Sequence, residues 1–488
     1  MNYISQVSTF ILKLVLSYLT ICLLVACATN RTTLPTDSAI TSITLAPTHT
    51  PKLLITDVAH FQETAVFLTS TPLPSPPPTS TITPAISTPM PTLTPIPEPQ
   101  PFLLVKTGAT AGSVTDLTIS DDGRYATIIQ DTQLFLYDML LDEATQIGPV
   151  SGQVFSAALS SDGQTVAYWG TMDSVNEIPD VEECQNPDSR ICGTLFIYDT
   201  VSGTTVSIPF GIRVGGLGLT LDVSVANNGL IAVSGDGIIH AGTFLIGGKG
   251  ESELKQISHE AIAISLSSNG RYLAYLTSTG IFVYNVEEDT SSQVTTTWPD
   301  VPPFHETATT QVDISDDGRF VVFVSRANIA ELPLTPCTHY LEQELPFCRH
   351  VYLIDRELNQ AELISVDDNE QPANDASENA FISADGRFIV FDSFANNLTD
   401  VPICESKFSQ CPQVYLRDRE QRQTYLLSQP ANDQLPNDGS FVAGISGNAA
   451  YVSIISGATN LTDATATETF YSRKGFILDL FSYLELMD

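Results

Sequence analysis

The chain has 488 residues, of which 43% are apolar, and its 56 acidic and 21 basic side chains give a formal net charge of −35. A surface this anionic repels a phosphate backbone, which excludes a nucleic-acid partner. The 23 Phe and 16 Tyr residues supply enough apolar surface to exclude a chain that is disordered throughout.

Residues 1–26 are typical of a secretion signal, in which Lys13 is the only charged side chain. The mostly apolar run that follows Lys13 is too short to span a bilayer. Its end, Leu24-Val-Ala-Cys27, resembles a bacterial lipobox, which implies cleavage before Cys27 and acylation of that cysteine. We therefore expect an exported protein, anchored by lipid to the outer face of a bacterial cell membrane, in the periplasm or at the cell surface. An ordinary signal peptide or an uncleaved anchor are the alternatives.

Residues 27–101 form the next predicted segment, and its second half is strongly biased in composition. Between Thr71 and Gln100, eleven of thirty residues are Pro and ten are Ser or Thr. Proline fixes φ and removes a hydrogen-bond donor, so this stretch predicts an extended chain that builds no core. We expect a disordered Pro/Thr-rich tether.

A short pattern recurs from residue 101 onward. An apolar residue is followed, usually after Ser, by Asp or Asn, then Gly, then a second apolar run. Asn-Gly and Asp-Gly suit a tight hairpin because both residues tolerate positive φ. Each copy therefore predicts the hairpin between the first two strands, A and B, of a repeat unit. The seven copies are marked by Asp122, Asp162, Asn228, Asn269, Asp317, Asp385 and Asn448, of which the last belongs to a degenerate copy, Ile445-Ser-Gly-Asn448.

A second apolar run that ends in Asp or Asn follows in five units, at 134–138, 195–199, 281–285, 351–355 and 414–418. These runs predict C strands, and a polar-apolar segment such as 361–365 predicts strand D. Four strands per unit at a period above 40 residues are typical of a propeller blade. We predict an all-β, seven-bladed β-propeller of four-stranded blades over 102–488. Residues 102–105 are a candidate outer strand of the last blade, whose own final strand is otherwise 482–486.

The repeat also resembles a known family. The segments Ile314-Ser-Asp-Asp-Gly-Arg-Phe320 and Val351-Tyr-Leu-Ile-Asp-Arg356 resemble the TolB-type, WD-repeat-like β-propeller repeat, over nearly all of 103–488. The resemblance implies the fold. TolB proteins carry an α/β domain before the propeller and dock on a peptidoglycan-associated lipoprotein, whereas this chain has a tether there and is itself a predicted lipoprotein. The resemblance therefore does not extend to the Tol-system role.

The spacing of the repeat points to three insertions. Successive turn markers lie 40, 66, 41, 48, 68 and 63 residues apart, and the three longest intervals contain all six cysteines of the repeat region. Export supplies an oxidising compartment, and local pairing explains why each pair lies in one insertion, although six cysteines allow fifteen pairings. Zinc is disfavoured because the spacings differ from Cys-x-x-Cys. We predict no metal, no cofactor and disulfides between Cys184 and Cys192, Cys337 and Cys348, and Cys404 and Cys411.

The insertions, 171–194, 326–350 and 395–413, lie between strands B and C of units two, five and six. B to C loops share one face of a propeller, so the three loops should face one another across the channel mouth. Disulfides reduce the entropy that such loops lose on binding, which suits a recognition surface. Protection of drifted loops from proteolysis is the alternative. Their acidic residues predict a cationic partner, or one bridged by a divalent cation: Glu182, Glu183, Asp188, Glu342, Glu344 and Glu405.

The sequence shows no catalytic motif. There is no Gly-x-Ser-x-Gly elbow, the Asp-Gly turns lack the Trp of sialidase Asp-boxes, and the seven histidines show no metal-binding spacing. The recurring turn aspartates, and the paired Asn397-Leu-Thr-Asp400 and Asn460-Leu-Thr-Asp463, predict structural turns. We therefore expect a monomeric, tethered binding or scaffold protein that recognises a protein or a cell-envelope glycan, and no enzyme. The alternative is a glycosidase-like or peptidase-like hydrolase with acidic residues in the central channel.

Overall fold

The computed structural model describes residues 102–105, 112–149, 152–170, 192–213, 222–236, 241–247, 254–260, 263–277, 279–294, 311–326, 328–329, 348–400, 411–430, 435–462 and 473–487. The signal, the tether and most of each insertion lie outside these residues. Within them, no helix is long and apolar enough to cross a bilayer.

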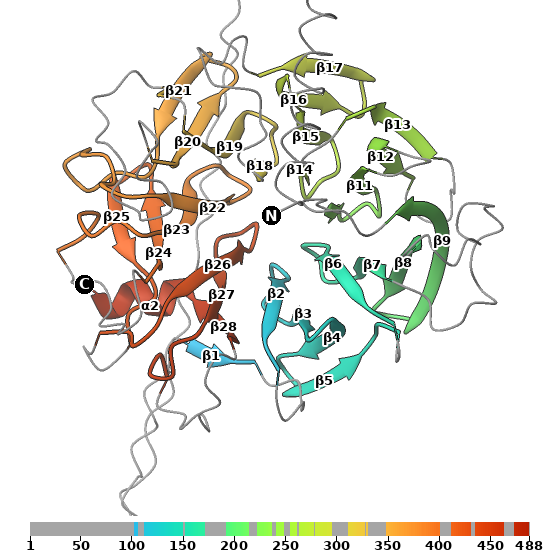
Figure 1. The fold of residues 1–488 in the computed structure, drawn as a ribbon, viewed down its shortest axis with the longest axis horizontal. Helices are drawn as coiled ribbons and strands as arrows, with labels where there is room; N and C mark the ends of the chain where they lie inside the picture. The colour runs from blue at the N-terminus through green and yellow to red at the C-terminus, as the bar shows by residue number, and fades with distance from the viewer. Residues whose placement is uncertain are drawn as a thin grey trace, which may run out of the picture. The chain divides into compact units, whose positions relative to one another are not determined.

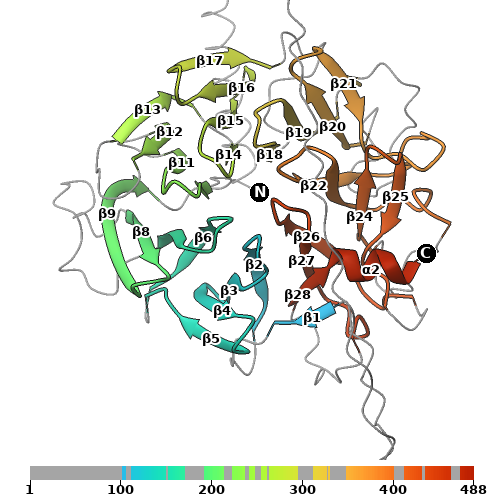
Figure 2. The same cartoon turned by 180° about the vertical axis from the view of Figure 1, so that it is seen from behind.

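The described chain forms seven four-stranded antiparallel sheets arranged around a central axis, as Figures 1 and 2 show from opposite sides. The predicted all-β, seven-bladed propeller is therefore confirmed. Blades 1 to 3 consist of β2 (Val114–Ile119), β3 (Tyr125–Gln130), β4 (Gln133–Asp138) and β5 (Glu143–Gln146); β6 (Val154–Leu159), β7 (Thr165–Gly170), β8 (Cys192–Asp199) and β9 (Thr204–Arg213); and β10 (Asp222–Val225), β11 (Ile231–Asp236), β12 (Ala241–Ile246) and β13 (Leu254–Ser258).

Blades 4 to 7 repeat this order from the axis outward. They consist of β14 (Ala263–Leu266), β15 (Tyr272–Thr277), β16 (Gly280–Asn285) and β17 (Thr290–Gln293); β18 (Val312–Ile314), β19 (Phe320–Ser325), β20 (His350–Asp355) and β21 (Gln360–Leu363); β22 (Ser377–Ile382), β23 (Phe388–Ser393), β24 (Gln413–Asp418) and β25 (Gln423–Leu426); and β26 (Ser440–Ile445), β27 (Tyr451–Ser456), β28 (Lys474–Asp479) and β1 (Phe102–Leu104). Because consecutive strands are antiparallel, the A–B and C–D turns lie at one end of the ring. The B–C and D–A loops lie at the other.

The ring closes through the N-terminal strand. β1 pairs with β28, with Phe102 opposite Leu478 and Leu104 opposite Phe476, so it is the outer strand of the last blade. The predicted outer strand at 102–105 is confirmed. The alternative final strand at 482–486 is wrong, because the chain forms helix α2 (Leu480–Met487) there.

The sequence of α2 explains this difference. Leu480 and Tyr483 are buried and Leu484 packs beside them on the core of blades 6 and 7, a spacing of three and four residues that matches a helix turn. Asp479 Oδ1 accepts a hydrogen bond from Ser482 N at 3.1 Å, as an N-cap carboxylate does. β1 already occupies the edge of β28 that a strand at 482–486 would need.

The hydrophobic core lies between neighbouring blades. B strands are buried along almost their whole length, and their apolar side chains pack against those of the adjacent sheet. At the closure, Leu117 and Ile128 of blade 1 pack with Ile455 and Ile477 of blade 7 in one buried cluster. Burial of apolar surface at this seam, like that at the other six, holds the ring closed.

The A–B turns have a common construction. In blade 1, Gly123 has φ of 68° and its N donates to Ser120 O, while Asp122 keeps negative φ. Ser120 Oγ donates to Asp122 Oδ1 at 2.6 Å and accepts from Tyr125 N at 3.0 Å. The hairpin is therefore a four-residue turn, 121–124, that needs positive φ only at Gly. The recurring Ser holds both ends of it.

Candidate functional site

A continuous circuit of hydrogen bonds joins the seven A–B turns around the axis. At each boundary between two blades, a turn residue of one blade donates a hydrogen bond to the next blade. The donor is the residue two positions before the turn Gly, or the residue that follows it in the chain. The contacts are Asp121 N to Ser161 O, Asp162 N to Asn227 Oδ1, Asn227 N to Ser268 O, Asn269 Nδ2 to Asp316 O, Asp316 N to Ala384 O, Ala384 N to Gly447 O, and Gly447 N to Asp121 Oδ1. The circuit fixes the rim of the central channel at this end.

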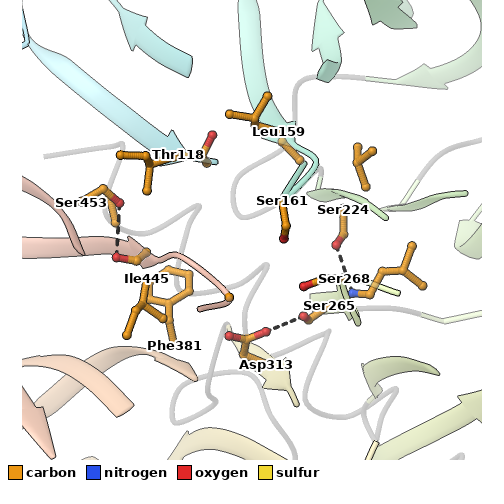
Figure 3. A pocket seen from close by; sticks show the side chains of 17 residues that line it. Thr118, Leu159, Ser161, Ser224, Ser265, Ser268, Asp313, Phe381, Ile445 and Ser453 are labelled. Carbon is orange, nitrogen blue, oxygen red and sulfur yellow. Dashed lines mark hydrogen bonds between the residues drawn. The ribbon is translucent and has the colours of Figure 1, made fainter. Parts of the chain in front are cut away.

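A cavity of about 190 Å³ lies at the A–B end of the channel (Figure 3). All seven innermost strands contribute to it at one position, five residues before the turn Gly or its equivalent: Thr118, Ala158, Ser224, Ser265, Asp313, Phe381 and Gly444. Ser161 and Ser268 line its rim. The lining is mainly hydroxyl groups and small side chains, with one carboxylate, Asp313.

Asp313 is held by both neighbouring blades. Its Oδ1 accepts from Ser265 Oγ at 2.5 Å, drawn in Figure 3, and its Oδ2 accepts from Ile382 N at 2.9 Å. Burial in the channel raises the pKa of Asp313, and these hydrogen bonds only partly offset that effect.

Two further carboxylates lie on the inner strands, Asp116 on β2 and Asp222 on β10. Burial raises the pKa of each to about 6, and the charges of Asp116 and Asp313 add to the effect on Asp222. Asp222 Oδ2 accepts from Ile264 N of the next blade at 3.2 Å, and Asp116 bonds Ala157 of the next blade. The innermost strand of each blade has one edge without a strand partner, so these side chains satisfy amides that the sheet leaves free.

The hydrolase alternative requires acidic residues in the central channel, and among the described residues these three carboxylates come closest to that requirement. Each of them already accepts backbone N–H groups of its own strand and of the next blade. That role is structural, and it recurs from seam to seam. No three His, Cys, Asp or Glu residues come together as a metal site among the residues that the structure describes.

The predicted binding residues cannot be placed. Cys27 and the six acidic residues Glu182, Glu183, Asp188, Glu342, Glu344 and Glu405 lie outside the described residues, as do Cys184, Cys337 and Cys404. Cys192 begins strand β8. Cys348 and Cys411 are buried, and each is disulfide-bonded. Their pairing with Cys337 and Cys404 stays a prediction.

The ends of the insertions can be placed, and they correct the predicted bounds. Cys192 to Thr194 belong to β8 and His350 begins β20, so they are strand residues. In blade 6, Ala395 and Leu398 are fully buried in the core between blades 5 and 6. The predicted insertion 395–413 therefore begins as packed structure, because its first residues carry apolar side chains that the core needs.

The bases of two insertions are tied to the next blade in the same way. Arg349 O, beside Cys348, accepts from Ser377 N, and Pro412 O, beside Cys411, accepts from Ser440 N, at 2.9 and 2.8 Å. Ser377 and Ser440 are the first residues of strand A in blades 6 and 7. Each buried cysteine thus lies at a seam between two blades.

Asn side chains clamp the B–C and D–A loops together in blades 6 and 7. Asn374 N donates to Asn397 Oδ1 at 2.9 Å, and Asn437 N donates to Asn460 Oδ1 at 3.1 Å. The amide groups of Asn397 and Asn460 donate to carbonyls of the same D–A loops, Pro372 O and Leu435 O. The predicted structural turns are confirmed as far as the described residues reach, and they stiffen the B–C end of the ring.

Asp392 on β23 is the most unusual carboxylate of this end. It is fully buried, Asn379 Nδ2 donates to its Oδ1 at 2.9 Å, and its Oδ2 has no hydrogen-bond partner among the described residues. Burial raises its pKa to about 8, and the charge of Glu378 acts in the same direction. Glu378 lies opposite Asp392 in the strand register and forms an ion pair with Arg349.

Sequence reasoning missed Asp116, Asp222, Asp313 and Asp392. A signal was available for the first two, since each is an Asp seven residues before a turn Gly, on the innermost strand of its blade. Asp313 stands five residues before Gly318, where other units carry Thr or Ser. Which strand edge these side chains reach depends on the neighbouring blade, and the chain order alone does not give it.

The chain is similar to several solved structures. No protein-family model matches the chain, and no curated protein matches it. Similar solved structures include the Cps50 (Swd1) β-propeller domain of Myceliophteria thermophila (10% identity, 78% of this chain and 99% of that chain, TM-score 0.43) and U3-55K (11%, 78% and 98%, 0.44). TolB from Acinetobacter baumannii is also similar (11%, 64% and 62%, 0.35). These likenesses concern the β-propeller fold alone.

Proposed function

We propose that the protein is an exported, lipid-anchored binding or scaffold protein, and that the B–C end of its propeller recognises a protein or a cell-envelope glycan. The observation that carries the proposal is the set of contacts at that end in blades 5 to 7. Two buried, disulfide-bonded cysteines, two seam hydrogen bonds and two Asn clamps hold the bases of its loops. Loops whose bases are held in this way have less freedom to lose on binding.

The anchor and the acidic insertions complete this proposal. The lipobox-like Leu24-Val-Ala-Cys27 is the basis for lipid anchoring, with two or three acyl chains giving stable attachment. The six acidic residues of the insertions favour a cationic partner, or one bridged by a divalent cation.

Affinity capture from the native envelope tests the proposal. The bait is the purified protein, and the matched control bait has 172–190, 331–346 and 402–409 replaced by short Gly-Ser linkers, which leaves every described strand intact. A partner retained by the intact bait and lost from the control supports the proposal. Equal retention by both baits contradicts the assignment of this surface, and cleavage of glycosidic or peptide substrates by the intact protein would favour the hydrolase.

A further inference from the structure

The cavity at the A–B end of the channel is a second candidate binding site, independent of the proposed B–C surface because it lies at the opposite end of the ring. Its volume of about 190 Å³ is slightly larger than an engineered cavity of about 150 Å³ that holds benzene. That space suits a group of about six heavy atoms. The ligand is therefore small, or is the end of a side chain.

The chemistry of the lining restricts the ligand further. Ser265 Oγ donates its proton to Asp313, and Ser224 Oγ accepts from Leu266 N at 3.0 Å, so both hydroxyl oxygens keep the capacity to accept a further hydrogen bond; both side chains line the cavity (Figure 3). Together with Asp313 they place acceptors of three adjacent blades along one side of the space. An uncharged alkyl group would leave this remaining acceptor capacity unused.

The charge of the channel is not balanced from within the described chain. Asp116, Asp222 and Asp313 form no ion pair with any described Lys, Arg or His. Three partly buried carboxylates, whose charges act on one another, favour a cation between their strands. Both oxygens of Asp313 already accept hydrogen bonds, so the carboxylate is not free to form the two parallel hydrogen bonds of a bidentate pair with a planar guanidinium. A compact ammonium group needs only one hydrogen bond to each acceptor.

We propose that the cavity binds one alkylammonium group, held by Asp313, Ser224 and Ser265, from a free polyamine or a lysine side chain. The alkyl stem lies against the apolar part of the lining, where Phe381 and Ile445 stand opposite the serines in Figure 3. The ammonium group supplies the charge partner that Asp313 lacks among the described residues.

Isothermal titration calorimetry of the purified protein with butylammonium tests this proposal, with butanol as the uncharged control of equal length. Three variants separate charge from space. Asp313→Asn removes the central charge, Ala158→Leu fills the cavity with every carboxylate kept, and Glu288→Gln removes one exposed charge that has no contact with the channel. Thermal unfolding first establishes that each variant is folded. Ser265→Ala replaces any variant that is not.

We expect butylammonium to bind and butanol not to bind. The affinity should fall at least tenfold in Asp313→Asn, several-fold in Ser265→Ala and below detection in Ala158→Leu, and should be unchanged in Glu288→Gln. It should rise between pH 5 and pH 8, because the carboxylates lose protons while the ammonium keeps its own.

The source of the ammonium group is tested with spermidine and with a peptide that has an acetylated N-terminus and one lysine with a free ε-amine. Tighter binding of spermidine assigns a free polyamine, and tighter binding of the peptide assigns a lysine side chain. Equal binding by Ala158→Leu, or no effect of Asp313→Asn, overturns the proposal. Loss of the envelope partner in the capture experiment has no bearing on this result.

Discussion

Gly123, in the first blade, lies against the ring of Tyr451 in the last blade, and a Cβ placed on Gly123 would come within 2.3 Å of Tyr451 Cζ. The same relationship recurs between Gly318 and Tyr272, at 2.5 Å, and between Gly386 and Phe320, at 2.3 Å. The first residue of strand B in one blade thus packs on the turn Gly of the next. At Gly123 the contact also joins the first blade of the ring to the last.

Gly123→Ala should therefore destabilise the protein by more than its backbone conformation explains. A left-handed φ costs an Ala about 1 to 2 kcal/mol, and the clash with Tyr451 adds to this. Gly203→Ala is the matched control, because Gly203 has nearly the same φ, 69° against 68°, with its nearest neighbour 3.8 Å away. Urea unfolding should give a larger loss for Gly123→Ala. Equal losses would show that the closure contact contributes nothing.

Asp392→Asn should remove part of the pH dependence of stability. The folded protein holds the Asp392 proton up to a pKa of about 8, against an ordinary value of 3.8, so this group's contribution to the free energy of unfolding falls as pH rises between these values. The variant should be the more stable protein at pH 8.5 by more than about 1 kcal/mol, since one pKa unit corresponds to about 1.4 kcal/mol. Unfolding curves at pH 5 and 8.5 measure this. Identical pH slopes for variant and wild type would contradict it, and Glu288→Gln should keep the wild-type slope.

Glu370→Gln should weaken the seam between blades 5 and 6. The guanidinium of Arg417 is 2% exposed, and it pairs with Glu370 at 2.6 Å and donates to Thr424 Oγ1 at 3.1 Å. Loss of the carboxylate leaves a buried cation without its charge partner, which should cost about 1 to 3 kcal/mol. Glu287→Gln is the control, because its ion pair with Arg271 is exposed and should be worth less than about 1 kcal/mol. Similar effects of the two changes would show that burial of Arg417 is unimportant.

Cys27→Ser should abolish lipid attachment. Metabolic labelling with a fatty-acid analogue should mark the wild-type protein and leave the variant unmarked, and the variant should leave the membrane fraction. Undiminished label in the variant would remove the basis for the anchor.

The sequence located the blades because their markers are local. In five of the seven A–B turns a Ser, an Asp or Asn and a Gly within four residues fix the turn by their own hydrogen bonds, as Ser120 and Asp122 do, so the copies could be counted without knowledge of the neighbouring blades. The circuit from Asp121 to Gly447 could not be predicted in this way, since residues 326 positions apart meet only when the ring closes.

The final helix and the channel carboxylates were missed for related reasons. Leu480, Tyr483 and Leu484 fit a helix period as well as a short strand, and the choice depends on whether β1 already occupies the sheet edge. The role of Asp116 and Asp222 depends on free amides of the next blade, which the order of residues along the chain does not reveal. Tertiary context decided both cases.

The most direct test of the account is the dissociation constant of the captured partner, measured for the intact protein and for the variant with all three insertions shortened. If the B–C end is the recognition surface, the blades should remain folded, since loop shortening has little effect on closure entropy. The affinity should fall at least tenfold, about 1.4 kcal/mol. An unchanged dissociation constant, with the variant shown to be folded, would contradict the central claim.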